Sequence, residues 1–139
     1  MAKLNTYLMF DGNCEEAFDF YKSIFGGEFT TKMRFKDFDS GQPVQKGEED
    51  KIMHVSLSIG NDILMGSDRP CTVDKAIVGN NFSISIAVES RAEVDKLFSG
   101  LSQGGKITMP VGDTFWGAYF GMVIDKFDIN WMVSFEAKK

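Results

Sequence analysis

Apolar and polar positions follow the same pattern twice along the chain. Residues 13–16 and 90–93 both have the spacing of a helix capping box, and each precedes a run of apolar residues with helical spacing. Both runs end at a pair of glycines, at 26–27 and at 104–105. The copies are offset by 77 residues at the caps, from 13 to 90, and by 78 at the glycines, from 26 to 104. This pattern predicts a duplicated supersecondary unit with a ligand site in the seam between its copies.

In each copy, the pattern of apolar and polar residues predicts a strand, a helix and three further strands. The first copy has a strand at 4–11, a helix that ends at Phe25, a strand at 29–35 and a hairpin over 52–65. The second has a strand at 82–88, a helix at 91–102, a strand at 106–111 and a hairpin over 118–136. The polar segment 36–50 predicts a long loop, which we expect to be mobile and to cover a ligand or a partner. The segment 67–80 predicts a linker between module one, at about 1–68, and module two, at about 80–139, within a single domain over residues 1–139.

Composition and charge exclude several classes of protein. A chain of 139 residues with 43% hydrophobic content fits one domain with an ordinary core. The net charge is −5, and basic residues are scattered through both copies, so we expect no nucleic-acid partner. No apolar stretch has the length of a signal peptide or a membrane span, so we expect a cytoplasmic protein with no membrane partner. Cys14 and Cys71 are too few for a disulfide framework, which fits a reducing compartment.

Short motifs across the whole chain resemble those of a known family. They are YLMFDGNCEEA at 7–17, MHV at 53–55, LMGSD at 64–68, DTFWG at 113–117, DKF at 125–127 and NWM at 130–132. With the paired βαβββ modules, they are similar to the PhnB-like branch of the glyoxalase/bleomycin-resistance/dioxygenase (vicinal oxygen chelate) superfamily. The resemblance implies an α+β fold in which two tandem modules form a cupped, barrel-like mixed sheet with helices outside. It also implies a homodimer, and some members carry the label 3-demethylubiquinone-9 3-methyltransferase-like.

The resemblance implies where a metal or a methyl-donor cofactor would be held. Metal ligands in the superfamily come from the first and last strands of each module, and the matching positions fall near Thr6, Leu64 or Met65, Ser83 and Met132. None of these side chains is an imidazole, carboxylate or thiolate, so we predict no metal site. Gly12 is a single glycine before the first helix, and no GxGxxG follows a strand, so we predict no S-adenosylmethionine or other cofactor.

Strand parity indicates where a ligand would bind. Along 52–59, the only histidine, His54, shares a face with Ser56, opposite the apolar residues Val55 and Leu57. The helices should cover the apolar face, so His54 should point into the cavity. The predicted lining is Thr6, Phe10, His54, Ser56, Ser83, Ser85, Trp116 and Tyr119. His54 could contact a ligand, act as a general base, or form only structural hydrogen bonds, and Cys14 could be a reactive thiol or a packing residue.

Two classes of function follow from these residues. The first is a small-molecule-binding protein of the superfamily, PhnB-like and without the metal site, that encloses a partly aromatic or hydrophobic molecule. The alternative is an enzyme of the lyase, dioxygenase or transferase type that uses a displaced metal site or His54. A structural dimer without a ligand is a third option. The sequence identifies neither the small molecule nor any catalytic residue.

Overall fold

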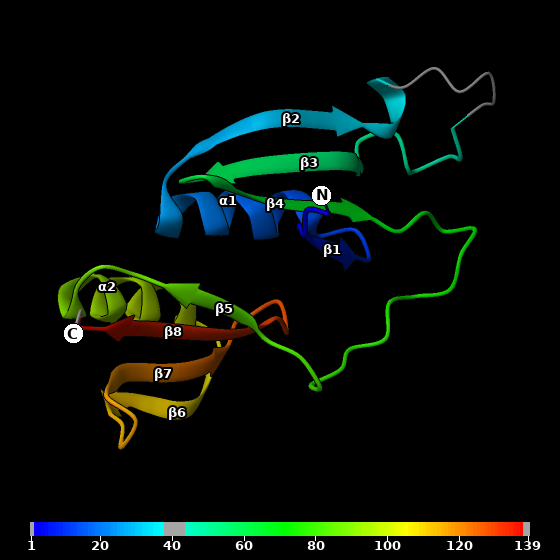
Figure 1. Ribbon diagram of the computed structural model, residues 1–139. Helices are drawn as coiled ribbons and strands as arrows, with labels where there is room; N and C mark the ends of the chain where they lie inside the picture. The colour runs from blue at the N-terminus through cyan, green and yellow to red at the C-terminus, as the bar shows by residue number, and fades with distance from the viewer. Residues whose placement is uncertain (1, 38–43, 138–139) are drawn as a thin grey trace. The chain divides into compact units, whose positions relative to one another are not determined.

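The computed structural model describes residues 2–37 and 44–137, and the chain divides into two compact units (Figure 1). Unit 1 spans residues 1–77 and unit 2 spans residues 78–139. Each unit has the element order βαβββ, which confirms the duplicated α+β modules. The strands divide equally between two four-stranded mixed sheets, one in each unit.

Unit 1 contains one helix and one sheet. Its elements are β1 (Thr6–Phe10), α1 (Cys14–Phe25), β2 (Glu28–Arg34), a short 3₁₀ turn η1 (Phe35–Asp37), β3 (Ile52–Ile59) and β4 (Asp62–Asp68). The strand order is β1-β4-β3-β2, with β1 parallel to β4 and the other neighbours antiparallel. The parallel pair needs a crossover connection, which α1 begins.

Unit 2 repeats this topology. Its elements are β5 (Ile84–Ala87), α2 (Arg91–Ser102), β6 (Lys106–Asp113), β7 (Ala118–Ile124) and β8 (Asn130–Glu136). The strand order is β5-β8-β7-β6, again with the first strand parallel to the last. The strand expected at 82–88 is shorter than predicted, because Phe82 and Ser83 precede β5, and Phe82 is 58% exposed.

The core of unit 1 lies between α1 and one face of its sheet. The Phe18 ring packs edge-on against Phe10 and Tyr21, with ring centroids 6.2 and 5.7 Å apart. It also lies so close to Gly66 that a Cβ there would come within 2.6 Å of it. Gly66 pairs with Val55, so the odd-numbered face of β3 is the one that α1 covers, as strand parity predicted.

The core of unit 2 lies between α2 and its sheet. A Cβ on Gly121 would come within 2.9 Å of the Phe98 ring of α2. Gly121 pairs with Val133, and Val133 pairs with Ile86, so these three residues share the face toward α2. The other buried residues of this core include Val94, Leu101, Val123 and Trp131.

Buried carboxylates tie together segments far apart in the sequence. Asp68 is 2% exposed and accepts hydrogen bonds from the N–H groups of Gly12 and Cys14, both at 2.9 Å, and of Ile52 at 2.8 Å. The expected capping box at Asn13 is wrong, because the Asn13 side chain makes no cap bond and Asp68 satisfies the first turn of α1 instead.

The cap expected at the second helix is present. Ser90 Oγ accepts a hydrogen bond from the Glu93 N–H at 3.1 Å. The buried carboxylate of unit 2 is Asp125, which accepts from the Trp131 indole N–H at 2.8 Å and from the Phe127 N–H at 2.7 Å. It therefore holds the β7–β8 turn, and not a helix.

The described part of the loop predicted at 36–50 is bonded to the rest of unit 1. The Lys36 N–H donates to the Glu49 carbonyl at 3.1 Å. Glu48 is 4% exposed, pairs with Lys51 and accepts from the Cys71 N–H at 2.6 Å. These contacts tie the segment 44–50 to unit 1, whereas residues 38–43 lie outside the described residues. The expected mobility of the loop stays a prediction.

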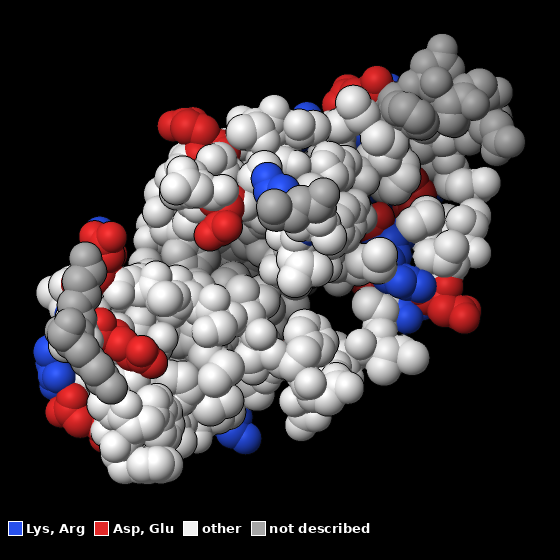
Figure 2. Space-filling model, viewed as in Figure 1, with Lys and Arg blue, Asp and Glu red and all other residues white. Residues whose placement is uncertain are grey.

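The distribution of surface charge and the character of the helices concern two predictions, the absence of a nucleic-acid partner and the absence of a membrane partner. Acidic and basic side chains are interspersed on the face in view in Figure 2. Neither described α-helix combines the length and the apolar character that crossing a membrane would need. The absence of a nucleic-acid partner stays a prediction.

Candidate functional site

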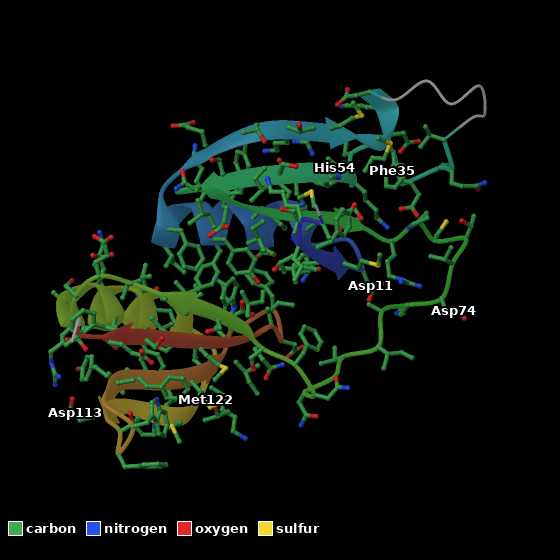
Figure 3. All side chains as sticks on the ribbon, in the orientation of Figure 1. Asp11, Phe35, His54, Asp74, Asp113 and Met122 are labelled. Carbon is green, nitrogen blue, oxygen red and sulfur yellow. The ribbon has the colours of Figure 1, made fainter. Side chains whose placement is uncertain are left out.

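The face of the unit 1 sheet opposite α1 carries the residues with the chemistry of a ligand site. Tyr7 of β1 pairs with Met65 of β4, and Met65 pairs with Ser56 of β3, so these side chains share one face. His54, which Figure 3 labels on β3, lies two residues before Ser56 and therefore shares its face, as strand parity predicted. Neighbouring β2 adds Met33, which pairs with His54.

His54 is at the centre of a group of hydroxyl side chains. Its Nε2 lies 3.0 Å from Ser56 Oγ, and its Nδ1 lies 3.4 Å from Tyr7 Oη. The Tyr7 and His54 rings are 5.7 Å apart between centroids and tilted by 31°. A neutral imidazole can accept at one nitrogen and donate at the other, so both contacts are compatible with one uncharged ring. We call these three residues the Tyr7–His54–Ser56 cluster.

Methionines surround this cluster on the same face. Met33 and Met65 are half-buried, and Met9, which alternates with Tyr7 on β1, is 53% exposed. Arg69 Nη1 lies 3.4 Å from Met9 Sδ. Thioether side chains are flexible and polarisable and favour contacts with aromatic rings. The face therefore joins a few fixed polar groups to an adaptable apolar surface.

Two residues predicted for this face lie on the opposite one. Phe10 is 4% exposed and packs against Phe18 of α1. Thr6 pairs with Leu64 and lies four positions before Phe10 on the same strand, so it also faces α1. The expectation that Thr6 and Phe10 share a face with His54 is therefore wrong. Tyr7, which sequence reasoning missed, takes that place.

The error is a shift of one residue between the copies. β1 begins at Thr6 and β5 at Ile84, which is an offset of 78, whereas the prediction matched Thr6 with Ser83 by the offset of 77 at the helix caps. With the offset of 78, Tyr7 is the counterpart of Ser85. The glycine pairs carry this offset in the sequence, so they were the signal that identifies Tyr7.

The predicted site residues of unit 2 also divide between two faces. Ser85 pairs with Met132 on the face opposite α2, and Ser83 precedes β5. Met132 pairs with Met122, which Figure 3 labels, so a pair of methionines lies beside Ser85. Trp116, in the turn before β7, is 50% exposed, and its ring centroid lies 5.7 Å from that of Phe120.

Tyr119 faces α2, so its expected place in a cavity wall is wrong. Its hydroxyl donates to Asp95 Oδ1 of α2 at 2.6 Å, which raises the pKa of the phenol. The Arg91 guanidinium lies 4.0 Å from the ring centroid and forms two hydrogen bonds with Asp113. This group joins α2 to β6 and β7 and explains Tyr119 as a structural residue.

The residues do not fit a metal or a methyl-donor cofactor. With the corrected offset, the positions opposite the helices are Tyr7 beside Met65 and Ser85 beside Met132, a set without imidazole, carboxylate or thiolate. Among residues 2–37 and 44–137, no group of three or more His, Cys, Asp or Glu side chains could hold a metal ion. At the start of α1, where a cofactor anion would bind, the N–H of Cys14 and that of Gly12 just before the helix already donate to Asp68.

The alternative of a reactive thiol at Cys14 is wrong. Cys14 is fully buried. Burial raises the pKa of this thiol far above its usual range, and the charges of Asp68 and Glu15 raise it further. The thiol therefore stays protonated in the first turn of α1 in spite of the helix dipole.

Comparisons with known proteins agree over almost the whole chain. A family model described as 3-demethylubiquinone-9 3-methyltransferase matches residues 2–134. The protein YjdN of Escherichia coli K12 is 32% identical over 140 residues, which cover 94% of this chain and 93% of that protein. The crystal structure of PA1353 from Pseudomonas aeruginosa is 40% identical, covers 99% of this chain and 100% of its own, and has a TM-score of 0.87.

Two further structures extend these similarities. A putative 3-demethylubiquinone-9 3-methyltransferase, PhnB protein, from Bacillus cereus is 29% identical, covers 96% of this chain and 99% of its own, and has a TM-score of 0.78. A glyoxalase/bleomycin resistance protein/dioxygenase family enzyme from Burkholderia phytofirmans is 15% identical, covers 95% and 98%, and has a TM-score of 0.63. The second likeness is one of fold alone.

Proposed function

The chain belongs to the 3-demethylubiquinone-9 3-methyltransferase family, the PhnB-like branch of the glyoxalase/bleomycin-resistance superfamily, and we propose that it is a small-molecule-binding protein that uses no metal. The observation that carries this proposal is the Tyr7–His54–Ser56 cluster among methionines on the sheet face opposite α1. Such a surface suits a planar, apolar or partly aromatic molecule with a hydrogen-bonding group.

The partners of His54 favour binding over catalysis. A histidine that acts as general base is usually oriented by a carboxylate or another fixed acceptor. Within the described residues, the hydrogen-bond partners of His54 are hydroxyl groups, from Tyr7 and Ser56. These contacts orient the ring, and a ligand that bonds to His54 would replace one of them, most readily the longer contact with Tyr7.

Unit 2 adds a second surface to the proposal. Ser85, Met122 and Met132 share the face opposite α2, and Trp116 contacts Phe120 at its edge. An exposed indole offers a flat surface on which an aromatic ligand could stack. We therefore propose Ser85 and Trp116 as a second candidate surface that belongs to unit 2 alone.

Two further properties belong to the same proposal. The protein forms a homodimer, because each sheet has two edge strands and because large apolar side chains, such as Phe115 at 98% exposure, remain on the surface. It is cytoplasmic, because Cys14 and Cys71 are both free thiols.

The test uses 2-naphthol, a planar ring system with one hydroxyl group, as the probe. We expect titration to give saturable shifts of the ¹H–¹⁵N amide signals of Tyr7, His54, Ser56 and Met65. His54→Ala should raise the Kd about fivefold, the loss of one hydrogen bond of roughly 1 kcal/mol.

A pair of matched variants separates the two faces. Tyr7→Phe removes one hydroxyl from the face opposite α1 and should weaken 2-naphthol binding, whereas Tyr119→Phe removes one from the face toward α2 and should not. Equal losses of affinity in the two variants, or saturable shifts confined to strands other than β1, β3 and β4, would overturn the proposal.

A further inference from the structure

A separate cavity lies wholly within unit 2, at the turn end of the β7–β8 hairpin. Its volume is about 330 Å³. The lining residues are Val78, Gly79, Asn80, Ile124, Asp128 and Asn130. From their chemistry we propose that this cavity binds a small organic ammonium ion, a primary amine on a short alkyl chain.

The chain builds this cavity by laying the segment 78–80 across the hairpin. The Asn130 side-chain N–H donates to the Gly79 carbonyl at 3.1 Å, which holds the segment against the start of β8. Asn130 pairs with Ile124 at the last rung of the hairpin. One wall therefore comes from the segment before β5, and the other from the two strand ends.

Hydrogen bonds to Asp125, within unit 2, hold the turn that carries Asp128. The Asp128 N–H donates to the Asp125 carbonyl at 3.0 Å, and the Asp125 carboxylate accepts from the backbone N–H groups on either side of Asp128, at Phe127 and Ile129. Asp128 has φ of +68°, a conformation that Asp and Asn tolerate better than most residues. These bonds fix the backbone that places Asp128 in the cavity lining.

The lining groups select for a cationic nitrogen. Within the described part of the chain, Asp128 is exposed and has no ion-pair partner, so its negative charge is available to a ligand. Asn130 uses its side-chain N–H toward Gly79 and keeps its amide oxygen as an acceptor. An ammonium group has three donors and no acceptor, which matches a carboxylate and amide oxygens.

The apolar lining and the volume set the rest of the ligand. Val78 and Ile124 provide apolar surface beside the polar groups. The volume lies at the lower end of the range of about 300–1,000 Å³ for ligand pockets. A short alkyl chain therefore fits, whereas an anionic ligand would meet the Asp128 carboxylate.

The experiment compares two probes of the same alkyl length, n-butylammonium at neutral pH and uncharged 1-butanol. With n-butylammonium we expect saturable shifts of the amide signals of Gly79, Asn80 and Asn130. With 1-butanol we expect none of comparable affinity. Saturable 1-butanol shifts with an equal Kd, or no saturable shifts with n-butylammonium, would overturn the proposal.

Variants test the role of the charge. Asp128→Asn keeps a residue that tolerates this backbone conformation but removes the charge, and it should raise the Kd for n-butylammonium about three- to fivefold, as a partly exposed ion pair would. Asp62→Asn, at the exposed start of β4 in unit 1, removes the same charge elsewhere and should leave the Kd unchanged. An unchanged Kd in Asp128→Asn, in a variant whose other amide signals match the wild type, would also overturn the proposal.

Discussion

The lack of a side chain at Gly66 lets α1 pack closely against the sheet of unit 1. A Cβ at this position would lie 2.6 Å from the Phe18 ring and 2.9 Å from the Leu8 carbonyl oxygen. Real Cβ atoms do not approach other atoms so closely, so any side chain forces α1 away from β4 and from the core it covers.

We therefore expect Gly66→Ala to lower the free energy of unfolding by about 1–3 kcal/mol, the usual effect of overpacking a core. The control is Gly112→Ala on β6, where a Cβ would meet nothing within 4 Å. Urea denaturation followed by circular dichroism gives both values. Equal stability changes in the two variants would contradict this account of Gly66.

The two thiols should differ in reactivity, because their surroundings differ. Cys14 is buried, whereas Cys71 is exposed. Burial raises the pKa of Cys14 and a hydrogen bond with Glu48 raises that of Cys71, so access of the reagent separates the two thiols. We expect one equivalent of thiol to react with a maleimide in the native protein at neutral pH, and two equivalents in denaturant. Mass spectrometry of the modified peptides identifies the sites. Labelling of Cys14 in the native protein, at a rate like that of Cys71, would show that the first turn of α1 opens.

At the scale of elements, an ion-pair cluster fastens α1 to β2. Glu15 accepts two hydrogen bonds from Arg34, at 3.1 and 2.5 Å, and contacts Lys32 at 2.8 Å. These hydrogen bonds, from Arg34 first and Lys32 second, lower the pKa of Glu15 from 4.5 to about 2. Because the folded-state pKa lies below the unfolded value, the unfolded chain takes up the proton first, and the contribution is lost as the pH falls.

The expected result for Glu15→Gln is a pH-dependent loss of stability. Above pH 4.5 the variant should be less stable than the wild type by about 0.5–1 kcal/mol, since the pair is partly exposed and screened by water. The difference should shrink as the pH falls from 4.5 toward 2. Urea denaturation across this range measures it. Glu16→Gln, the neighbouring substitution in the same helical turn, is the control, and an identical pH profile in both variants would argue against the cluster.

Element boundaries were largely predictable because their signals are local. Gly26 ends α1, and Ser90 caps α2, at the places where glycine and serine favour those roles. The first turn of α1 was not predictable in this way. Its cap is Asp68, which lies 54 residues from Cys14 along the chain and reaches α1 only when β4 is paired with β1.

At the scale of the whole molecule, a ligand surface that uses no metal predicts that added metal ions leave the stability of the protein unchanged. We expect the melting temperature to stay unchanged when Zn²⁺, Ni²⁺, Mn²⁺ or a chelator is added. A metal raises the melting temperature only if it binds the folded state, and we propose that this protein binds none. Differential scanning fluorimetry of the wild type and His54→Ala measures this. A rise of several degrees with one metal in the wild type alone would identify His54 as a ligand and favour the enzyme alternative.

Self-association is the second expectation at this scale. Each sheet has two edge strands, and apolar side chains remain exposed, so pairing of two copies would cover surface that a monomer leaves in water. Size-exclusion chromatography with light scattering should give about twice the 15.5 kDa mass of the chain. A monomer mass at all micromolar concentrations would refute the dimer.

The sequence by itself determined the duplicated βαβββ modules, the family and the face on which His54 and Ser56 lie. These features rest on periods of 3.6 and 2 residues and on short motifs, which need only neighbouring residues. The tertiary structure alone decided the rest of the candidate site. Tyr7, and not Thr6 or Phe10, lies opposite α1, because strand register fixes the face of every side chain and a shift of one residue reverses it.

In unit 2 as well, the tertiary structure and not the local sequence decided which face each side chain occupies. Tyr119 belongs to the α2 face because Asp95 and Arg91 meet it there, although its place in the sequence beside Trp116 favoured the ligand surface. The cavity at Asp128 exists because the segment 78–80 crosses the end of a hairpin about 50 residues later, held by the bond from Asn130 to Gly79. Contacts between distant segments form only when the strands pair, and no local pattern in the chain encodes them.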